Sequence, residues 1–220
     1  MYPCIDIALT DKLSELDEAL LNLKHYDWLI FTSSNTVHAL VSHIKNRGLT
    51  VDWSDVKIAC VGTKTVATVH EETACDVDFI PRTHTGLRLA SDIPIKPDET
   101  LLLPQSELAD DSLFKALMLR GVQVKLIEAY RNIIGQDGDD IPTLIEENRI
   151  DAITFTSGST ITNFMKRISP LTAFEIPAVC IGSSSYKVAR DAGFRQVYYP
   201  EKFTIPDMIE LLSGLFDKEN

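Results

Sequence analysis

The stretch that decides the fold occurs twice, as DWLIFTSSNT at residues 27–36 and as DAITFTSGST at residues 151–160. Each copy begins with Asp, continues through apolar residues to Phe, and ends in Thr-Ser and a small polar run. Two further echoes follow: KIACVGTKT (57–65) with PAVCIGSSS (177–185), and Pro81 with Pro200. The paired Phe, Gly and Pro residues are 124, 120 and 119 residues apart. An internal repeat of this length predicts two similar domains.

Both copies alternate short apolar runs with helical patterns. The sequence predicts strands at 28–31, 58–62, 77–81, 100–104 and 122–132 in the first copy, and at 152–155, 178–182 and 197–199 in the second. Strands that alternate with helices form parallel sheets covered on both faces. We therefore predict an α/β fold with one domain at 11–128, a second formed by 1–10 and 136–220, and a linker at 129–135.

Composition and charge exclude several classes of function. The chain has 220 residues, 45% of them hydrophobic, which is enough to bury a core. It lacks an apolar run of about 18 residues and a basic, apolar leader, so we expect neither a membrane span nor a signal peptide. The net charge of −11 disfavours nucleic acid and anionic membranes as partners. The four cysteines lack metal-ligand or disulfide spacing, which predicts free thiols, no metal and a cytoplasmic location.

Both FTS motifs and both glycine turns lie where a predicted strand ends and a helix begins. In open parallel sheets, ligands bind outside the carboxyl ends of the strands. Ser and Thr at such turns cap the helix, and the remaining N–H groups favour a carboxylate or a phosphate. Capping alone is a common reason for these residues, but four turns matched in pairs favour a cleft lined with anion-binding helix starts. The sequence has no GxGxxG, P-loop, Ser-His-Asp or Cys-His pattern, so neither a nucleotide nor nucleophilic catalysis is predicted.

These turns, together with LLLPQSELADDSLFKALMLRGVQVKLIEAYRN at residues 101–132, resemble the uroporphyrinogen-III synthase family over nearly the whole chain. The resemblance implies two flavodoxin-like parallel-sheet domains joined by a two-stranded linker, with the active site in the interdomain cleft. It implies closure of hydroxymethylbilane to uroporphyrinogen III, with inversion of the last ring and loss of water, in tetrapyrrole biosynthesis. It also implies a monomer that uses no cofactor or metal and binds a small substrate with eight carboxylates.

The resemblance assigns site residues as well. The Tyr after the fifth strand is Tyr130, which the family favours as proton donor to the departing hydroxyl, although a core-packing role for this ring stays open. Strand-end and glycine-turn residues are implied in substrate binding, with Ser106 beside them: Thr32, Ser33, Ser34, Thr63, Thr65, Gln105, Ser157, Gly158, Ser184 and Ser185.

The chain departs from the family pattern in several places. A basic residue and a Gly usually follow the LLLP strand, where this chain has Gln105 and Ser106, and Pro is frequent where it has Ser34 and Gly158. Family members usually begin with a further strand, helix and strand ahead of Pro3, so we expect either a shortened gene or a reduced second domain. Two alternatives follow: a non-catalytic tetrapyrrole- or anion-binding relative, and a two-lobed sugar- or anion-binding regulator, which the lack of a basic patch disfavours.

Overall fold

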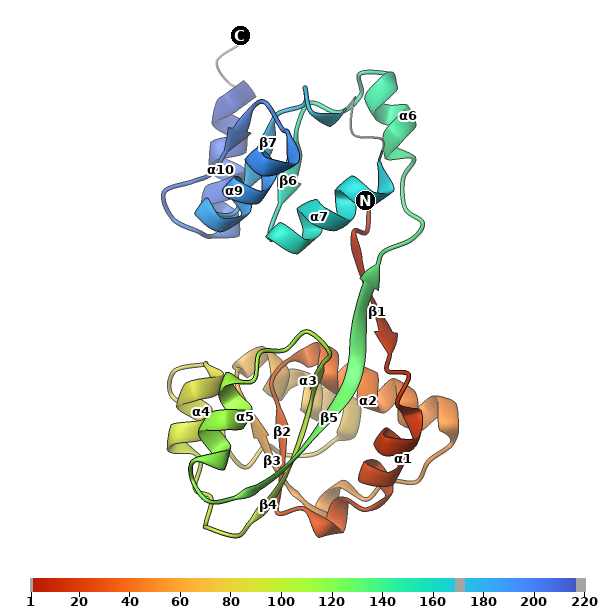
Figure 1. Cartoon of the computed structure of the whole chain (residues 1–220), viewed down its shortest axis with the longest axis vertical. Coiled ribbons are helices and arrows are strands. Elements are labelled where there is room, and N and C mark those ends of the chain that lie inside the picture. The colour runs from red at the N-terminus through yellow and green to blue at the C-terminus, as the bar shows by residue number, and fades with distance from the viewer. Residues whose placement is uncertain (1, 169–172, 217–220) are drawn as a thin grey trace. The chain divides into compact units, whose positions relative to one another are not determined.

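The chain forms two compact units in the computed structural model, which describes residues 2–168 and 173–216. The five-stranded unit is Ile7–Asn132, and the three-stranded unit is Met1–Asp6 with Ile133–Asn220. Figure 1 labels the helices and strands of both units. Among the described residues, no helix combines the length and the apolar character that crossing a bilayer requires.

Two strands continue from one unit into the other. These are β1 (Ile5–Leu9) and β5 (Gln123–Ile134), which are neighbours in the sheet. The Gly135 N–H donates to the Cys4 carbonyl at 3.3 Å, and the Thr10 N–H donates to the Ala129 carbonyl at 3.4 Å. Residue numbers rise along one strand as they fall along the other, so β1 and β5 run in opposite directions.

The remaining strands of the five-stranded unit are parallel. They are β2 (Trp28–Phe31), β3 (Lys57–Cys60) and β4 (Thr100–Ser106), and the sheet order is β1-β5-β4-β2-β3. The chain therefore passes from β2 outward to β3 and returns on the other side of β2 to form β4 and β5. This makes the space beyond β2 and β4 a topological switch point, where open α/β sheets bind their ligands.

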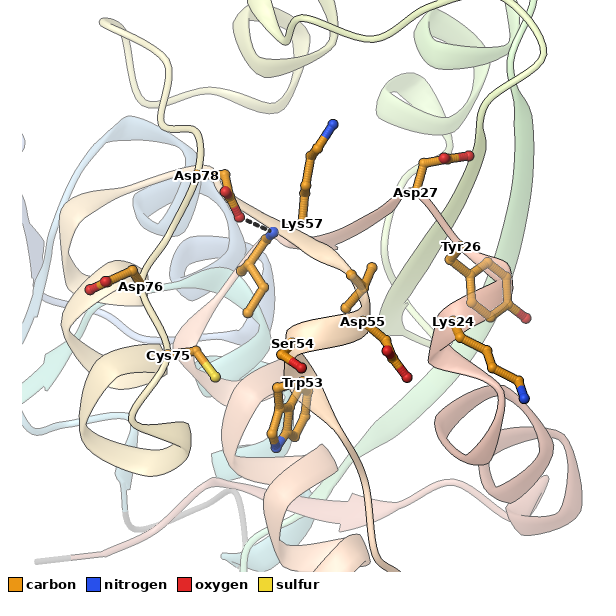
Figure 2. A pocket seen from close by; sticks show the side chains of 12 residues that line it. Lys24, Tyr26, Asp27, Trp53, Ser54, Asp55, Lys57, Cys75, Asp76 and Asp78 are labelled. Atoms are coloured by element: carbon orange, nitrogen blue, oxygen red, sulfur yellow. Dashed lines mark hydrogen bonds between the residues drawn. The ribbon is translucent and has the colours of Figure 1, made fainter.

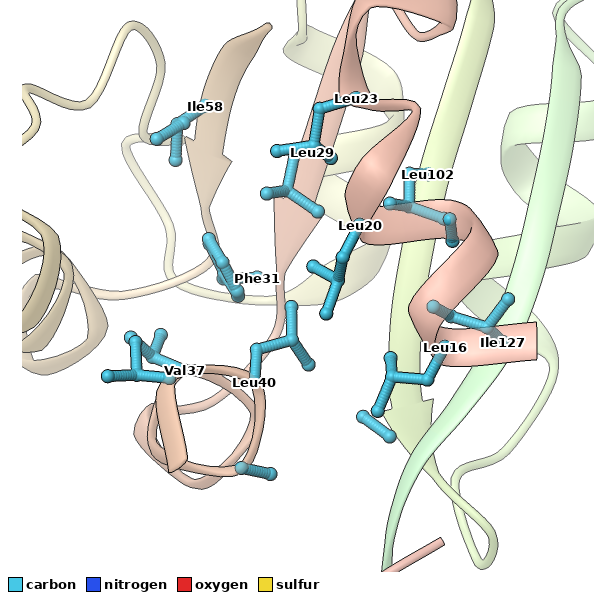
Figure 3. Close-up of a cluster of buried hydrophobic side chains, with 14 of the residues drawn as sticks. Leu16, Leu20, Leu23, Leu29, Phe31, Val37, Leu40, Ile58, Leu102 and Ile127 are labelled. Atoms are coloured by element: carbon cyan, nitrogen blue, oxygen red, sulfur yellow. The ribbon is translucent and has the colours of Figure 1, made fainter. Parts of the chain in front are cut away.

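Helices cover both faces of this sheet because its strands alternate their buried side chains. Leu29 and Phe31 pack on one face with residues of α1 (Leu13–Leu21), α2 (Ser34–Arg47) and α3 (Thr63–Thr73). Trp28 and Ile30 pack on the other face with α4 (Gly86–Asp92) and α5 (Ser112–Met118). Figure 3 shows the first of these clusters, in which Leu16 and Leu20 of α1 lie against β2 and β4.

Helix α1 was not predicted, and a polar contact reinforces its packing. The Asp17 carboxylate of α1 accepts a hydrogen bond from His43 Nε2 of α2 at 2.6 Å, and His43 is 1% exposed. Arg47 Nη2 donates to the other carboxylate oxygen at 2.8 Å. The hydrogen bond from His43, followed by that from Arg47, holds the pKa of Asp17 below its usual value.

The three-stranded unit has the sheet order β6-β7-β8, with parallel pairing throughout. Its core centres on aromatic rings: Phe155 contacts Phe164 and Phe194 edge to face, with ring centroids 5.4 and 5.5 Å apart. Its elements are α6 (Ile141–Glu146), β6 (Ile153–Phe155), α7 (Gly158–Arg167), β7 (Ala178–Cys180), α9 (Ser183–Ala192), β8 (Val197–Tyr198) and α10 (Ile205–Phe216). Helix α6, which was also not predicted, begins in the Gly- and Asp-rich segment that follows β5.

The internal repeat is visible in the structure. The segments β2-α2-β3-α3 and β6-α7-β7-α9 follow the same order, and β2 and β6 belong to different sheets. The pairing of Val179 with Tyr198 has its counterpart in the bridge between Ala59 and Phe79.

Two expectations from the sequence need correction. The segment 77–81 contributes only a single bridge, at Phe79, rather than a strand. The reason is that the Asp78 side chain reaches β3: its Oδ2 accepts the Ile58 N–H at 2.8 Å, a donor that a strand carbonyl would otherwise take. Residues 1–10 were expected to belong to the second domain, but β1, which lies among them, pairs with β5 of the five-stranded sheet and not with β6–β8.

Candidate active site

The carboxyl edge of the five-stranded sheet brings together polar residues from four strands. Thr32 and Ser33 follow β2, Gly62 follows β3, and Gln105 and Ser106 end β4. In β5, Tyr130 lies opposite Ser106. These positions are distant in the sequence, and the parallel strand order makes them neighbours at one edge.

The Tyr130 hydroxyl lies at the start of helix α2. Its oxygen is 3.5 Å from Ser33 Oγ, and Ser33 is the N-cap of α2, because its Oγ accepts the Thr36 N–H at 3.3 Å. The Thr36 hydroxyl lies 3.1 Å from the same oxygen. A small group of hydroxyls thus surrounds the amino end of a 14-residue helix, whose dipole favours negative charge there.

The backbone holds Tyr130 firmly in place. Its side chain is 7% exposed and belongs to the core formed with α1, α2 and α3, and its carbonyl accepts the Glu107 N–H at 3.1 Å. Asn132 Nδ2 donates to Ser106 Oγ at 3.3 Å, which orients the facing residue of β4. The ring is therefore both a packing element and the support of a nearly buried hydroxyl.

Gln105 and Thr32 face a separate cavity on the side of the sheet that α4 and α5 cover. We call it the switch-point cavity; its volume is about 390 Å³, and it is lined by Thr32, Val61, Thr85, Gly86, Leu87, Gln105, Ala109, Asp110, Ser112 and Leu113. The lining residues at the starts of α4 and α5 were not predicted from the sequence. The capping hydroxyl of Thr85, which accepts the Arg88 N–H at 3.3 Å, was the available signal.

The glycine turns do not present all the predicted hydroxyls to solvent. Thr63 is exposed, whereas Thr65 is buried in the first turn of α3. In the other unit Ser184 is exposed, whereas Ser185 is buried and its Oγ donates to the Gly182 carbonyl at 3.0 Å. The two glycines that cap α3 and α9 supply no side-chain acceptor, so the first N–H groups of both helices are without a side-chain cap.

The strand-end serines repeat one arrangement in the two units. Ser157 caps α7 by accepting the Thr160 N–H at 3.2 Å, as Ser33 caps α2. Gly158 leaves room for α9, because a Cβ at this position would lie 3.1 Å from a methyl group of Val188. In the other unit, Ser34 Oγ accepts from the Thr68 hydroxyl at 2.9 Å, which ties α2 to α3.

A second cavity of the five-stranded unit, shown in Figure 2, lies at the opposite, amino edge of the sheet. Its volume is about 570 Å³, and four aspartates and two lysines line it: Asp27, Asp55, Asp76, Asp78, Lys24 and Lys57. One of these carboxylates, that of Asp78, is occupied by the Ile58 N–H. The excess of negative charge makes this edge a poor site for a polycarboxylate.

Comparison with known proteins identifies the family of the chain. The sequence model described as uroporphyrinogen-III synthase HemD matches residues 1–210. The chain belongs to the uroporphyrinogen-III synthase family. Its fold is similar to that of the crystal structure of uroporphyrinogen-III synthetase from Helicobacter pylori, with a TM-score of 0.63, 19% identity and coverage of 96% of this chain and 91% of that one.

Curated relatives of this uroporphyrinogen-III synthase family member carry related names. The chain is 27% identical over 96% of its length to the porphyrin biosynthesis protein HemD of Ruminiclostridium josui, and it spans 42% of that protein. It is also 27% identical over 99% of its length to the putative uroporphyrinogen-III synthase of Methanocaldococcus jannaschii, of which it spans 89%.

Proposed function

We propose that the chain is a uroporphyrinogen-III synthase, a lyase of tetrapyrrole and heme biosynthesis that cyclises hydroxymethylbilane with inversion of ring D and loss of water. Family membership and the names of its relatives indicate this function. One observation links this function to a particular site. The Tyr130 hydroxyl lies beside Ser33, the N-cap of α2, and the same kind of serine cap recurs at α7 in the other unit.

The residues at this edge suit a substrate with many carboxylates. Because the net charge is −11, the field of the whole protein does not attract such a ligand, and local donors must bind it. The uncapped N–H groups at the starts of α3 and α9 are such donors, and the helix dipoles add to them. Thr63 in the first turn and Ser183 and Ser184 in the second are exposed hydroxyls.

The remaining assignments stay part of the proposal. Each unit forms one domain, and the substrate lies between the domains, as the family resemblance implies. A monomer acts without a cofactor. The substrate-binding set is that assigned from the resemblance; within it, the burial of Thr65 and Ser185 favours a role in shaping the turns.

The proposed chemistry needs only a weak acid and a fixed substrate conformation. The lone pair of a pyrrole nitrogen expels the hydroxyl of the bilane, and the Tyr130 O–H donates a proton so that the group leaves as water. The resulting cation is attacked by the substituted carbon of the last ring, which gives a spiro intermediate on the way to the inverted product. Unaided closure yields the uninverted isomer, so the site must stabilise this transition state in preference to the direct one.

Turnover of hydroxymethylbilane with separation of the product isomers tests the proposal. We expect uroporphyrinogen III as the main product, in excess of the type I isomer that forms spontaneously. A protein that binds the tetrapyrrole but leaves only type I product would be the non-catalytic binding relative instead. That alternative predicts a dissociation constant that Tyr130→Phe leaves unchanged and only the spontaneous type I isomer with either form.

A further inference from the structure

The switch-point cavity contains a buried amide that the protein itself does not pair. Gln105 is 6% exposed and lines the cavity. Within residues 2–168 and 173–216, its side chain has no hydrogen bond to another residue, and neither of its amide atoms is sealed off from the cavity. An amide group carries two N–H donors and a carbonyl acceptor. A ligand in the cavity can therefore form hydrogen bonds with this group without breaking one inside the protein.

Asp110 fixes the kind of ligand that this cavity favours. It lines the cavity with Gln105, and its Oδ1 accepts the Ser112 N–H at 2.8 Å. Hydrogen bonds from the Ser112 hydroxyl and N–H hold the pKa of Asp110 below its usual value, so the group is a carboxylate at neutral pH. The lining residues include no Lys or Arg. A carboxylate in this cavity would meet like charge, whereas an N–H donor would form a charge-assisted hydrogen bond.

The walls of the cavity are partly apolar. Val61, Leu87 and Leu113 contribute the apolar side chains. The volume of about 390 Å³ lies within the range of small-molecule sites. Apolar walls beside two polar acceptors match a heteroaromatic ring with an N–H at its edge.

We propose that the switch-point cavity binds a pyrrole ring of the substrate through its N–H group, with Asp110 and the Gln105 carbonyl oxygen as the acceptors. This inference rests on the proposed function, because it takes the bilane as the ligand. Pyrrole N–H groups then bind beside Asp110, whereas carboxylates bind at the uncapped starts of α3 and α9. The cavity thereby orients a ring rather than neutralising an acid.

Charge-changing variants test the sign of this recognition. Asp110→Asn should raise KM for hydroxymethylbilane about tenfold, because a neutral acceptor replaces a charged one. Asp111→Asn is the matched control: it removes the same charge one residue away, from a side chain that pairs with Lys115 at 2.7 Å and does not line the cavity. Gln105→Glu should keep binding because it preserves an acceptor, and Gln105→Leu should weaken it. An Asp110→Asn protein with unchanged or lower KM overturns the inference, as does a large KM increase for Gln105→Glu alone.

A binding measurement separates this inference from the proposed function. The probes are a pyrrole whose only substituents are an acetate and a propionate, and its N-methyl derivative, which keeps both acids and lacks the N–H. The side-chain amide NMR signal of Gln105 should shift with the first probe and much less with the second. Equal shifts, or no shift with either probe, overturn the inference. A protein with the expected shifts but no formation of uroporphyrinogen III would refute the proposed function and leave the cavity assignment standing.

Discussion

Replacing Tyr130 with Phe tests separately how much its hydroxyl contributes to catalysis and how much it contributes to stability. The ring remains in a position that is 7% exposed, so packing is preserved. The only hydrogen-bond contact of the hydroxyl among the described residues is Ser33 Oγ at 3.5 Å, which is longer than the usual O–H···O distance. We therefore expect the free energy of unfolding to fall by less than about 1 kcal/mol. If the hydroxyl protonates the departing group, turnover should fall about 100- to 10,000-fold, equivalent to about 2.7 to 5.4 kcal/mol in the barrier.

The assay combines single-turnover kinetics, with isomer analysis of the oxidised product, and denaturant unfolding of the same preparations. Tyr26→Phe is the control, because Tyr26 is a partly buried tyrosine of the same unit at the opposite edge of the sheet. We expect Tyr26→Phe to turn over as the parent protein does, and the loss in Tyr130→Phe to appear in kcat rather than KM. Full turnover by Tyr130→Phe would refute the reasoning and leave Tyr130 as a core residue.

Three further predictions concern stability. Ser33→Ala and Ser157→Ala each remove a helix cap, so each should lower the free energy of unfolding by about 0.5–2 kcal/mol in denaturant titrations, with Ser→Gly costing less. Gly135→Ala would place a Cβ in a steric clash with the Pro3 carbonyl oxygen, so thermal unfolding should occur at lower temperature and amide exchange near residue 4 should quicken. The pKa of Asp17 is depressed by its hydrogen bond from His43, so this carboxylate stabilises the fold above its unfolded pKa and the benefit is lost as pH falls through the folded value. The stability difference between the parent and Asp17→Asn should therefore be present at pH 7 and shrink below about pH 4; a constant difference would contradict it.

The alternation of strands and helices was predictable because each strand is an apolar run that ends in a turn with a cap. Helix α1 and helix α6 were not predicted, since both lie outside the repeated segments that guided the assignment. The strand expected at 77–81 failed for a reason that pattern alone does not reveal: an aspartate in the middle of the run uses its side chain, in place of a backbone carbonyl, to pair with Ile58.

The candidate site was predictable at its turns and not at its walls. Ser33 and Ser157 follow from a local rule, because a hydroxyl before a helix accepts an N–H three residues on. The burial of Thr65 and Ser185 depends on which way the first helical turn faces, which tertiary packing decides. Asp110 lines the same cavity as Gln105 because the turn before α5 lies beside the switch point, and no spacing in the sequence reveals this arrangement.

The two copies of the repeat differ in how deeply the strand is buried, but the turn after the strand is the same in both. All four residues of β2 are buried between β3 and β4, whereas β6 has one neighbour among the described strands and leaves Thr154 exposed. Packing therefore places different demands on the two strands. Yet Ser33 and Ser157 adopt nearly the same backbone angles and cap their helices in the same way, and an uncapped glycine turn follows each. Helix capping accounts for both serines, whereas the uncapped N–H groups of the two glycine turns are the shared feature that supports the proposed binding of carboxylates in both units.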